Sequence, residues 1–461
     1  MRFIGRKEEL NRIKRLINMT NQNNILIYGR RRIGKSYLIK KALEDFNGKV
    51  IHYQCKEISY SNTIEELSNI ISKVLNINYR MSFLSIEDIL DFLFNYNENI
   101  VLVLDEYPYL LKKIEGLNSI IQNKIDLNKY ESKLKLILSG SQIEIMKNMI
   151  DYASPLFGRF NDVIELKEHN YIEAAEYYPN YSNEEKVLLY SIFGGEPLYN
   201  SAIDCSKSVE ENIIDLIVKE NSFVELNIQN MVNIELSKIG YAYDVLQAIA
   251  TGTRKNDDLV TKSHASSPAN LNPAIQKLLK MDLIKKISPI NDENNKKKIM
   301  YFINNNALRF YYKYIYRFST ERNNMNAEDF YNKFIKTDLY NLLVPVEFEN
   351  IAKQFLLIQN KNKKITPAFS KIGTFWYDDK KNKINGQFDL VTLDENGYIF
   401  YEVKYTKNPI DSKVINEEIN QLSKLGISYY KLGFISKTGF KITTKNDYTL
   451  ISLEDIYNIN V

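Results

Sequence analysis

Uninterrupted apolar runs alternate with amphipathic stretches over the first third of the chain. The runs end near Tyr28, Leu104 and Ser139, and each has the length of one strand buried on both faces. The stretches that are typical of helices are 37–46, 62–75 and 85–96. This alternation predicts βαβ units, so we expect an α/β domain built on a parallel sheet.

The middle of the chain has a different pattern, of three helices followed by a hairpin. The expected helices are 241–250, 256–261 and 269–281, and the hairpin segments 283–287 and 299–303 flank a polar, lysine-rich tip. This order predicts a winged helix-turn-helix. The positions expected to face DNA are Asn270, Asn272, Lys277, Lys280, Lys296, Lys297 and Lys298. The alternative is a packing module that contacts no DNA.

After Asp338 the pattern changes again, to a helix, three strands, a second helix and a strand. The helices are expected at 340–358 and 412–425, and the strands at 374–377, 387–393, 398–405 and 430–435. We therefore expect a separate, smaller α/β domain. The predicted domains are an α/β core at 1–166, a helical segment at 167–235, the winged helix at 236–320 and the C-terminal domain at 330–461.

The composition mainly excludes certain classes of protein and site. A net charge of +4 in 461 residues is too small to indicate a nucleic-acid partner, so any basic surface must be local. Two cysteines exclude a disulfide framework and a cysteine-rich zinc site. The N-terminus lacks the apolar core of a signal peptide and no run reaches 18 apolar residues, so we expect a cytoplasmic protein without a membrane span. The three histidines lie far apart, and each is expected to be an isolated structural or surface residue.

One octapeptide carries the first candidate site. The segment fits G-x-x-x-x-G-K-[ST] between an apolar strand and a helix, which is the context of a phosphate-binding loop. Its residues are Gly29, Arg30, Arg31, Arg32, Ile33, Gly34, Lys35 and Ser36. Loop N–H groups would hold phosphate oxygens, Lys35 would reach the β- and γ-phosphates, and the Ser36 hydroxyl would bind Mg²⁺.

The next two strands supply the remaining candidates for this site. The strand that ends in Asp105 and Glu106 predicts a second Mg²⁺ ligand in Asp105 and a residue that orients and deprotonates water in Glu106. Ser139 and Ser141, at the end of the following strand, are candidates for sensing the γ-phosphate. Arg159 is a candidate arginine finger, in its own subunit or in a neighbour, and the alternative is a structural ion pair.

These motifs give the first domain a family resemblance. Together with the opening segment 3–10 and the segments Leu156–Arg159 and Phe193–Pro197, they resemble the predominantly archaeal ATPases, on the AAA+/STAND side of the P-loop NTPases. The resemblance covers about residues 1–235. It implies a P-loop ATPase core at 1–166, with a parallel sheet like that of RecA and AAA proteins, and a helical lid at 167–235. It implies ATP as the nucleotide, with Gly5 and Arg6 near the adenine, and a nucleotide-driven switch in a possible homo-oligomer.

The C-terminal domain carries a second candidate constellation. Asp389 and Glu402 lie on paired strands, and Lys404 shares a strand face with Glu402. Glu349, or alternatively Glu347, would complete a Mg²⁺ site from the preceding helix, and Gln421 would contact substrate. Carboxylates that hold Mg²⁺ beside a lysine that activates water suit phosphodiester cleavage. The alternative is a Lys/Glu-rich hairpin with no catalytic role.

This segment resembles the uncharacterised domain that commonly follows archaeal-type ATPases, and that domain is similar to the PD-(D/E)xK nucleases, with their restriction-endonuclease-like fold. The combined resemblance implies an ATPase whose nucleotide state controls a DNA-acting nuclease domain. The second hypothesis is a STAND-like switch whose C-terminal domain binds nucleic acid or protein without cleavage.

Overall fold

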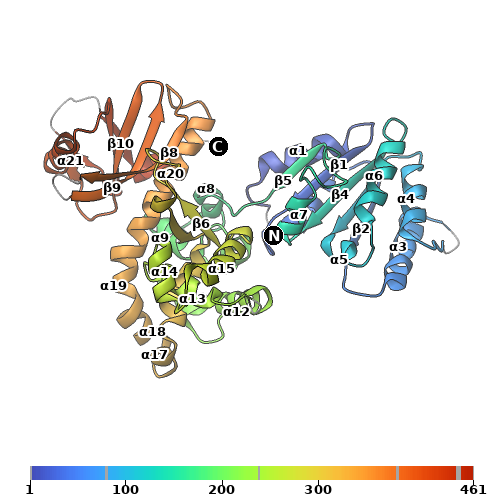
Figure 1. Ribbon diagram of the computed structural model, residues 1–461, viewed down its shortest axis with the longest axis horizontal. Helices are drawn as coiled ribbons and strands as arrows, with labels where there is room; N and C mark the ends of the chain where they lie inside the picture. Colours follow the sequence, from blue (N-terminus) through green and yellow to red (C-terminus); the bar gives the residue numbers. More distant parts are fainter. Residues whose placement is uncertain (1–2, 78–80, 237–238, 380–383, 443–447, 460–461) are drawn as a thin grey trace. The chain divides into compact units, whose positions relative to one another are not determined.

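The computed structural model describes residues 3–77, 81–236, 239–379, 384–442 and 448–459. The chain divides after Glu168 into two units, Met1–Glu168 and His169–Val461 (Figure 1). Within the described residues, no helix combines the length and the apolarity that crossing a membrane requires.

A parallel five-stranded sheet forms the centre of the first unit. Its strands are β1 (Asn23–Tyr28), β2 (Lys49–Gln54), β3 (Ile100–Asp105), β4 (Leu134–Gly140) and β5 (Asp162–Glu165). The strand order is β2-β3-β4-β1-β5, and every pair is parallel. Strands β1, β3 and β4 are buried at every position, which explains their uninterrupted apolar runs. The prediction of an α/β fold with a parallel sheet is confirmed.

Helices cover both faces of this sheet. They are α1 (Lys7–Ile17), α2 (Lys35–Leu43), α3 (Tyr60–Val74), α4 (Ile86–Phe94), α5 (Pro108–Leu111), α6 (Leu117–Leu127) and α7 (Ile143–Asn148). Because successive side chains of a strand point to opposite faces, Ile25 and Ile27 pack in one hydrophobic cluster, whereas Leu26 and Tyr28 pack in the other. The sheet therefore has one core above it and one below it.

The second unit begins with a helical segment. Its elements are α8 (Tyr171–Ala175), α9 (Asn183–Phe193), α10 (Pro197–Asn200), α11 (Val209–Ile213), the π-helix η1 (Ile214–Val218) and α12 (Phe223–Leu236). The Gly-Gly pair after α9 has a steric cause. Gly194 ends the helix at a positive φ of 59°, and a Cβ on Gly195 would collide with the backbone of His169.

Three helices and a hairpin follow, at the positions expected from the sequence. They are α13 (Ala242–Ala250), α14 (Asn256–Lys262), α15 (Pro268–Lys280), β6 (Ile284–Ile287) and β7 (Met300–Ile303), with β6 and β7 antiparallel. Asn270, Asn272, Lys277 and Lys280 lie on the exposed side of α15. The hairpin tip is anchored, because Lys298 pairs with Asp292 at 2.9 Å and Asn291 Nδ2 donates to the Trp376 carbonyl at 2.8 Å.

Short helices lead from the hairpin to the C-terminal sheet. They are α16 (Asn306–Phe310), η3 (Tyr311–Tyr316), α17 (Ser319–Asn323), α18 (Ala327–Phe330), η4 (Tyr331–Ile335), α19 (Lys336–Asp338), η5 (Leu339–Leu343) and the long α20 (Val344–Lys361). The sheet has the order β14-β12-β10-β9-β8. Its strands are β8 (Lys371–Asp379), β9 (Ile384–Asp394), β10 (Gly397–Lys404), β12 (Lys431–Ser436) and β14 (Thr449–Ser452), with α21 (Ser412–Leu425) between β10 and β12. The smaller strands β11 (Ile410–Asp411) and β13 (Phe440–Lys441) pair as a separate two-stranded sheet, and α22 (Leu453–Tyr457) follows β14.

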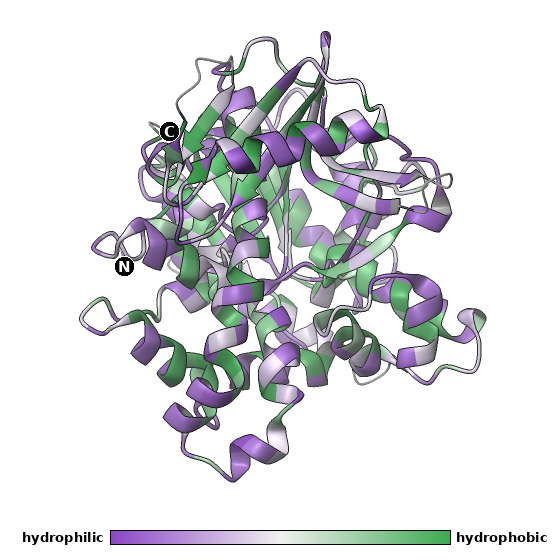
Figure 2. Cartoon of the chain, turned by 90° about the vertical axis from the view of Figure 1, so that its left-hand side faces the viewer, coloured by the Kyte–Doolittle hydropathy of each residue, from purple (hydrophilic) through white to green (hydrophobic). Residues whose placement is uncertain are grey.

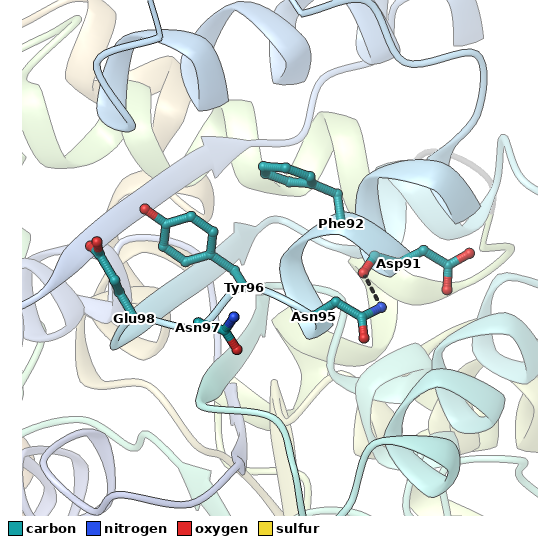
Figure 3. Close-up of a pocket in the computed structure, with 6 residues that line it drawn as sticks. All are labelled: Asp91, Phe92, Asn95, Tyr96, Asn97 and Glu98. Carbon is teal, nitrogen blue, oxygen red and sulfur yellow. Dashed lines mark hydrogen bonds between the residues drawn. The ribbon is translucent and has the colours of Figure 1, made fainter.

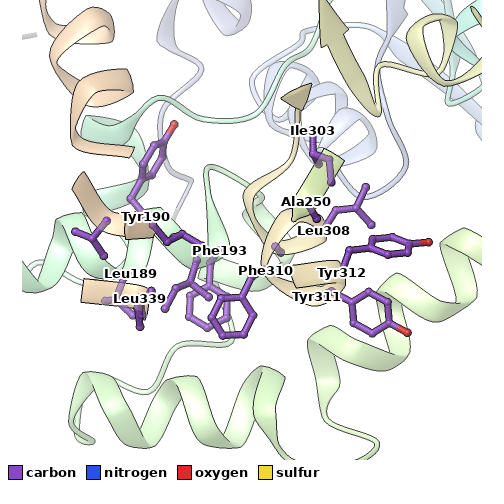
Figure 4. Close-up of a cluster of buried hydrophobic side chains, with 14 of the residues drawn as sticks. Leu189, Tyr190, Phe193, Ala250, Ile303, Leu308, Phe310, Tyr311, Tyr312 and Leu339 are labelled. Atoms are coloured by element: carbon purple, nitrogen blue, oxygen red, sulfur yellow. The ribbon is translucent and has the colours of Figure 1, made fainter. Parts of the chain in front are cut away.

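The helical segment, the hairpin region and the C-terminal sheet share one hydrophobic core. A single cluster of buried side chains extends from Tyr171 to Ile456, and Figure 4 shows the part where α9, α13, β7 and α16 meet. Figure 2 shows hydrophobic residues concentrated in the strands and polar residues on the outward helix faces. The three domains that the sequence predicts after residue 166 therefore lie within one unit, and their separate boundaries remain predictions.

Candidate nucleotide site and acidic cluster

The loop between β1 and α2 requires glycine at both fixed glycine positions. A Cβ on Gly29 would collide with the Leu166 carbonyl oxygen, and Gly34 has a φ of 95°, in the left-handed region that favours glycine. Lys35 follows at the start of α2, and its Nζ donates to the Gly29 and Arg30 carbonyls at 3.0 Å each. The lysine is thus buried inside the curve of the loop, where it faces the space that a phosphate would occupy.

Asp105 connects the loop to the neighbouring strands. Its carboxylate accepts hydrogen bonds from Ser36 Oγ at 2.6 Å and from Ser139 Oγ, and His52 Nε2 lies 3.8 Å away. Burial by itself would raise the pKa of Asp105, but the nearby His52 and the hydrogen bonds from Ser139 and Ser36 outweigh it and lower the pKa to about 2. A fully ionised carboxylate beside a serine hydroxyl is the oxygen-rich ligand set that Mg²⁺ prefers.

Glu106 is oriented by the strand that lies between the two motifs. Because β4 lies between β1 and β3, its end brings Ser141 beside Glu106, and the Glu106 carboxylate accepts from Ser141 N at 3.1 Å and Ser141 Oγ at 2.7 Å. Glu106 also has a φ of 54°, which non-glycine residues seldom adopt. Ser139 and Ser141, the candidates for sensing the γ-phosphate, bind Asp105 and Glu106, and their sensing of the nucleotide stays a prediction.

Arg159 lies away from these residues in its own chain. Its guanidinium pairs with Asp126 at 3.1 Å, and its carbonyl accepts from Asn24 Nδ2 at 2.9 Å. Asn24 is near the amino end of β1, whereas the phosphate loop follows the carboxyl end, so the strand separates the two. An arginine finger acting within one subunit is therefore the wrong prediction for Arg159, and the ion pair is what the structure contains.

Two arginines of the loop contact neighbouring elements. Arg30 pairs with Glu168 at 3.1 Å, and Arg31 Nη2 donates to the Tyr109 hydroxyl at 3.0 Å. Arg6 is buried and donates to the Lys167 carbonyl. The loop and the N-terminal segment are thus both attached to the end of the first unit.

His52 was expected to be an isolated residue, and this expectation is wrong. Its neighbours Ile51 and Tyr53 are buried in the core, while His52 itself points outward beside Asp105. The alternation of buried and exposed residues within β2 shows only that the His52 side chain points away from the core. The strand order, which the sequence does not reveal, places it beside the carboxylate.

A surface pocket of about 500 Å³ lies elsewhere in the first unit. Figure 3 shows its lining, from the end of α4 to the segment that precedes β3: Asp91, Phe92, Asn95, Tyr96, Asn97 and Glu98. This is the amino end of β3, whereas Asp105 is at its carboxyl end. The pocket is therefore separate from the candidate nucleotide site.

In the second unit, the C-terminal sheet gathers the predicted acidic residues. Asp389 and Glu402 come next after the last registered pair of β9 and β10, Leu390 with Tyr401. Lys404 Nζ pairs with Glu402, and Gln387 Nε2 donates to Asp389 Oδ1 at 2.6 Å. From α20, Glu349 lies in the electrostatic field of Asp389, Glu402 and Lys404.

The structure gives the helix residues around this cluster different partners. Glu347 is buried and pairs with Arg309 at 2.9 Å, so its carboxylate binds the helical part of the unit and not the acidic cluster. Gln421, which was expected to contact substrate, donates to the Tyr377 hydroxyl at 3.1 Å. Sequence reasoning missed Glu418, which is buried on α21 near Glu402, Lys404 and Asp389.

Burial and mutual repulsion disfavour the charged forms of these carboxylates. Burial, followed by the charges of Asp389 and Glu402, raises the pKa of Glu349 to about 8. Burial and the Glu402 charge raise the pKa of Glu418 to about 7. The pKa of Lys404 is raised, because its bond to Glu402 outweighs burial.

The cluster fits a divalent cation in charge and donor type, but not in spacing. Buried Glu418, half-buried Glu349 and Glu402 and exposed Asp389 bring several carboxylates together, and bound Mg²⁺ would relieve their mutual repulsion. Among the described residues, however, no group of three or more His, Cys, Asp or Glu side chains has a spacing that could hold a metal ion. For a metal ion to bind here, the Glu402 carboxylate would have to release Lys404 and bind the cation instead.

The sheet order and the Lys35, Ser36 and Asp105 geometry define the class of the first unit as a P-loop ATPase domain. Residues 3–200 match the family described as an ATPase domain predominantly from Archaea. Among solved structures, the Walker-type ATPase of Pyrococcus abyssi is similar, with a TM-score of 0.51 and 19% identity over 68% of this chain and 96% of that one. That likeness supports the fold.

Similarity to one archaeal protein covers both units. An uncharacterized protein of Methanocaldococcus jannaschii is 30% identical over 98% of this chain and 99% of its own length, and this chain belongs to the same family. An uncharacterized ATP-binding protein of that organism is 54% identical over 43 residues, 9% of this chain and 73% of its own length. Residues 311–419 match a family of archaeal and bacterial proteins of unknown function.

Proposed function

We propose that this protein binds and hydrolyses ATP with Mg²⁺, and that the nucleotide state controls a Mg²⁺-dependent centre in the second unit that acts on DNA. The observation that carries the ATP part is the hydrogen bond of 2.6 Å between Ser36 and Asp105. It joins the two predicted metal ligands, which come from different motifs, at one point.

The residues of the first unit have distinct roles in this proposal. Lys35 leaves the Gly29 and Arg30 carbonyls to bind phosphate oxygens, and the loop N–H groups hold the same phosphates. Ser36 and Asp105 would hold Mg²⁺, which neutralises charge on the phosphates when bound. Glu106 accepts a proton from the attacking water. Since Ser141 holds the Glu106 carboxylate, Ser141 determines when that carboxylate is free to act.

In the second unit, the acidic cluster supports the DNA-acting part. Glu349, Asp389 and Glu402 would hold Mg²⁺, which supplies an activated water and stabilises charge on the scissile phosphate. Lys404 orients that water from the same strand as Glu402. A similarity between the C-terminal domain and the PD-(D/E)xK nucleases, the winged helix and a homo-oligomer are further parts of this proposal. A trans role of Arg159 belongs to it as well, since the ion pair with Asp126 is half-exposed.

The second candidate is a STAND-like switch without cleavage. It is favoured by the pairing of Glu402 with Lys404 and by the lack of a metal-binding spacing among the described carboxylates. In this case ATP binding would change the exposed surface of the second unit, and that unit would bind nucleic acid or protein.

One experiment separates the two. Supercoiled plasmid and single-stranded DNA are incubated with the full chain and Mg²⁺ or Mn²⁺, with and without ATP. We expect cleavage that Asp389→Asn abolishes and that Glu395→Gln, in the exposed turn of the same hairpin, retains. Lys35→Ala should lose ATP binding and ATP control but not the fold. No cleavage under any condition, with ATP binding intact, would establish the switch.

A further inference from the structure

Residues 166–168 are the last of the first unit, and the phosphate loop contacts two of them. The Leu166 carbonyl lies so close to Gly29 that a Cβ there would collide with it. Arg30 Nη1 donates to Glu168 Oε1 at 3.1 Å, and the two side chains are only 14% and 21% exposed. The start of the phosphate loop is therefore attached to the end of the unit at two points, one by packing and one by a half-buried ion pair.

Phosphate binding would disturb both of these points. Lys35 Nζ donates to the carbonyls of Gly29 and Arg30, so a phosphate that draws Lys35 away removes a bond from each of the two loop residues that contact segment 166–168. A guanidinium also binds phosphate with the same forked N–H groups that it offers to a carboxylate. The phosphates of a nucleotide and the Glu168 carboxylate therefore compete for Arg30.

His169, the residue after Glu168, begins the second unit and is fixed within it. Its N–H donates to the Gly195 carbonyl at 2.9 Å, and its backbone lies so close to Gly195 that a Cβ there would collide with it. Its carbonyl accepts from the Tyr190 hydroxyl of α9 at 3.3 Å. One peptide bond therefore joins a carboxylate that the phosphate loop holds to a residue whose N–H and C=O both bind the helical segment.

Other ion pairs at the end of the first unit have partners outside the phosphate loop. Glu165, three residues before Glu168, pairs with Lys147 of α7 at 2.8 Å. Asp162, at the start of β5, accepts from Arg12 Nε of α1 at 2.9 Å. These pairs attach β5 to helices of the first unit. Glu168 differs from both acidic residues because its partner belongs to the loop that would bind the phosphates.

We propose that the Arg30–Glu168 ion pair couples the bound nucleotide to the second unit. Arg30 releases Glu168 to bind the phosphates of ATP, and segment 166–168 is then free to rearrange where it enters the second unit. An arginine with two alternative anionic partners has two discrete arrangements, which is what coupling between distant sites requires. ATP, with one phosphate more than ADP, competes better for the guanidinium. The inference rests on the proposed ATP binding and assigns the contact through which the nucleotide state leaves the first unit.

The first measurement is hydrogen–deuterium exchange of the full chain with Mg²⁺ and a non-hydrolysable ATP analogue, with Mg²⁺ and ADP, and without nucleotide. Peptides that cover residues 166–175 report the segment, because the Leu166 and His169 amides are both hydrogen-bonded. We expect the analogue to speed exchange in these peptides by about fivefold, the lower end of ordinary coupling between sites, and ADP to speed it less.

The second measurement is the affinity of the same analogue for two variants, by isothermal titration calorimetry. Glu168→Gln removes the competitor for Arg30, so we expect the analogue to bind about fivefold more tightly, since coupling between sites is reciprocal. Exchange at 166–175 in this variant should be fast already without nucleotide. Glu165→Gln is the matched control, because it breaks an ion pair of the same part of the chain whose partner lies outside the loop. It should retain the parent's affinity and exchange.

Each outcome decides a different point. If the parent binds the analogue but exchange at 166–175 does not respond, the coupling is refuted and the proposed ATP site stands. Unchanged or weaker binding in Glu168→Gln refutes the competition for Arg30 in the same way. A parent that binds no analogue would refute both the ATP site and the coupling. The exchange measurement on the parent uses no substitution, so the proposal stays testable even if Glu168→Gln folds poorly.

Discussion

Replacing Asp105 with asparagine tests whether the hydrogen bonds around this carboxylate stabilise its charge. The side chain is 3% exposed and receives bonds from Ser36 and Ser139, with His52 alongside. Asparagine has nearly the same shape but stays neutral at every pH. The difference in stability between the two proteins therefore reports the value of the charge.

The magnitude follows from the pKa. In the folded protein the pKa of Asp105 is lowered from 3.8 to about 2. This shift of nearly two pKa units corresponds to roughly 2.5 kcal/mol of free energy of unfolding. Because the folded pKa is below the unfolded one, this stability is fully present above pH 4 and is lost as the pH falls towards 2.

The measurement is urea unfolding at pH 7 and at pH 3, followed by circular dichroism. We expect Asp105→Asn to be less stable by about 2.5 kcal/mol at pH 7 and the difference to shrink at pH 3. Asp126→Asn is the control, because Asp126 is an exposed partner of Arg159 and its loss should cost less than about 1 kcal/mol. An equal difference at both pH values would show that shape, and not charge, accounts for the effect.

Three further changes have defined outcomes. Ser141→Ala removes a donor to Glu106, so we expect kcat for ATP hydrolysis to change by about tenfold while KM for ATP stays the same, in steady-state assays. Arg322→Met leaves Glu225 buried without its partner, and thermal unfolding should report a loss of about 3–5 kcal/mol. Glu349→Gln should match the original protein in stability at pH 5, where Glu349 is protonated. It should be more stable at pH 9, because the raised pKa of Glu349 makes ionisation destabilising as pH rises through 8.

The sequence predicts strands well where burial is complete. In β1, β3 and β4 every position is buried, so the apolar runs and the strands coincide. The glycine positions and Lys35 follow from a motif whose geometry is local to the chain. Local patterns contain less information about Arg159, which follows a segment of irregular turns. Its ion pair with Asp126 depends on how this segment passes beside α6, which carries Asp126.

The candidate residues that the sequence missed depend on contacts between distant segments. Glu418 gave a weak signal, since it lies between Ile415 and Leu422 on the apolar face of its helix and is charged where burial is expected.

The shared core of the second unit determines how this protein can be divided. The family of unknown function matches residues 311–419, which begin at η3 and end inside α21. A fragment cut at those limits would expose the side chains of α20 that pack on α9, and it would lack β12 and β14 of its own sheet. The C-terminal sheet is therefore not a domain that can be cut out and keep its core covered. A fragment that contains this sheet would therefore need the helices of residues 171–236 to keep the shared core covered.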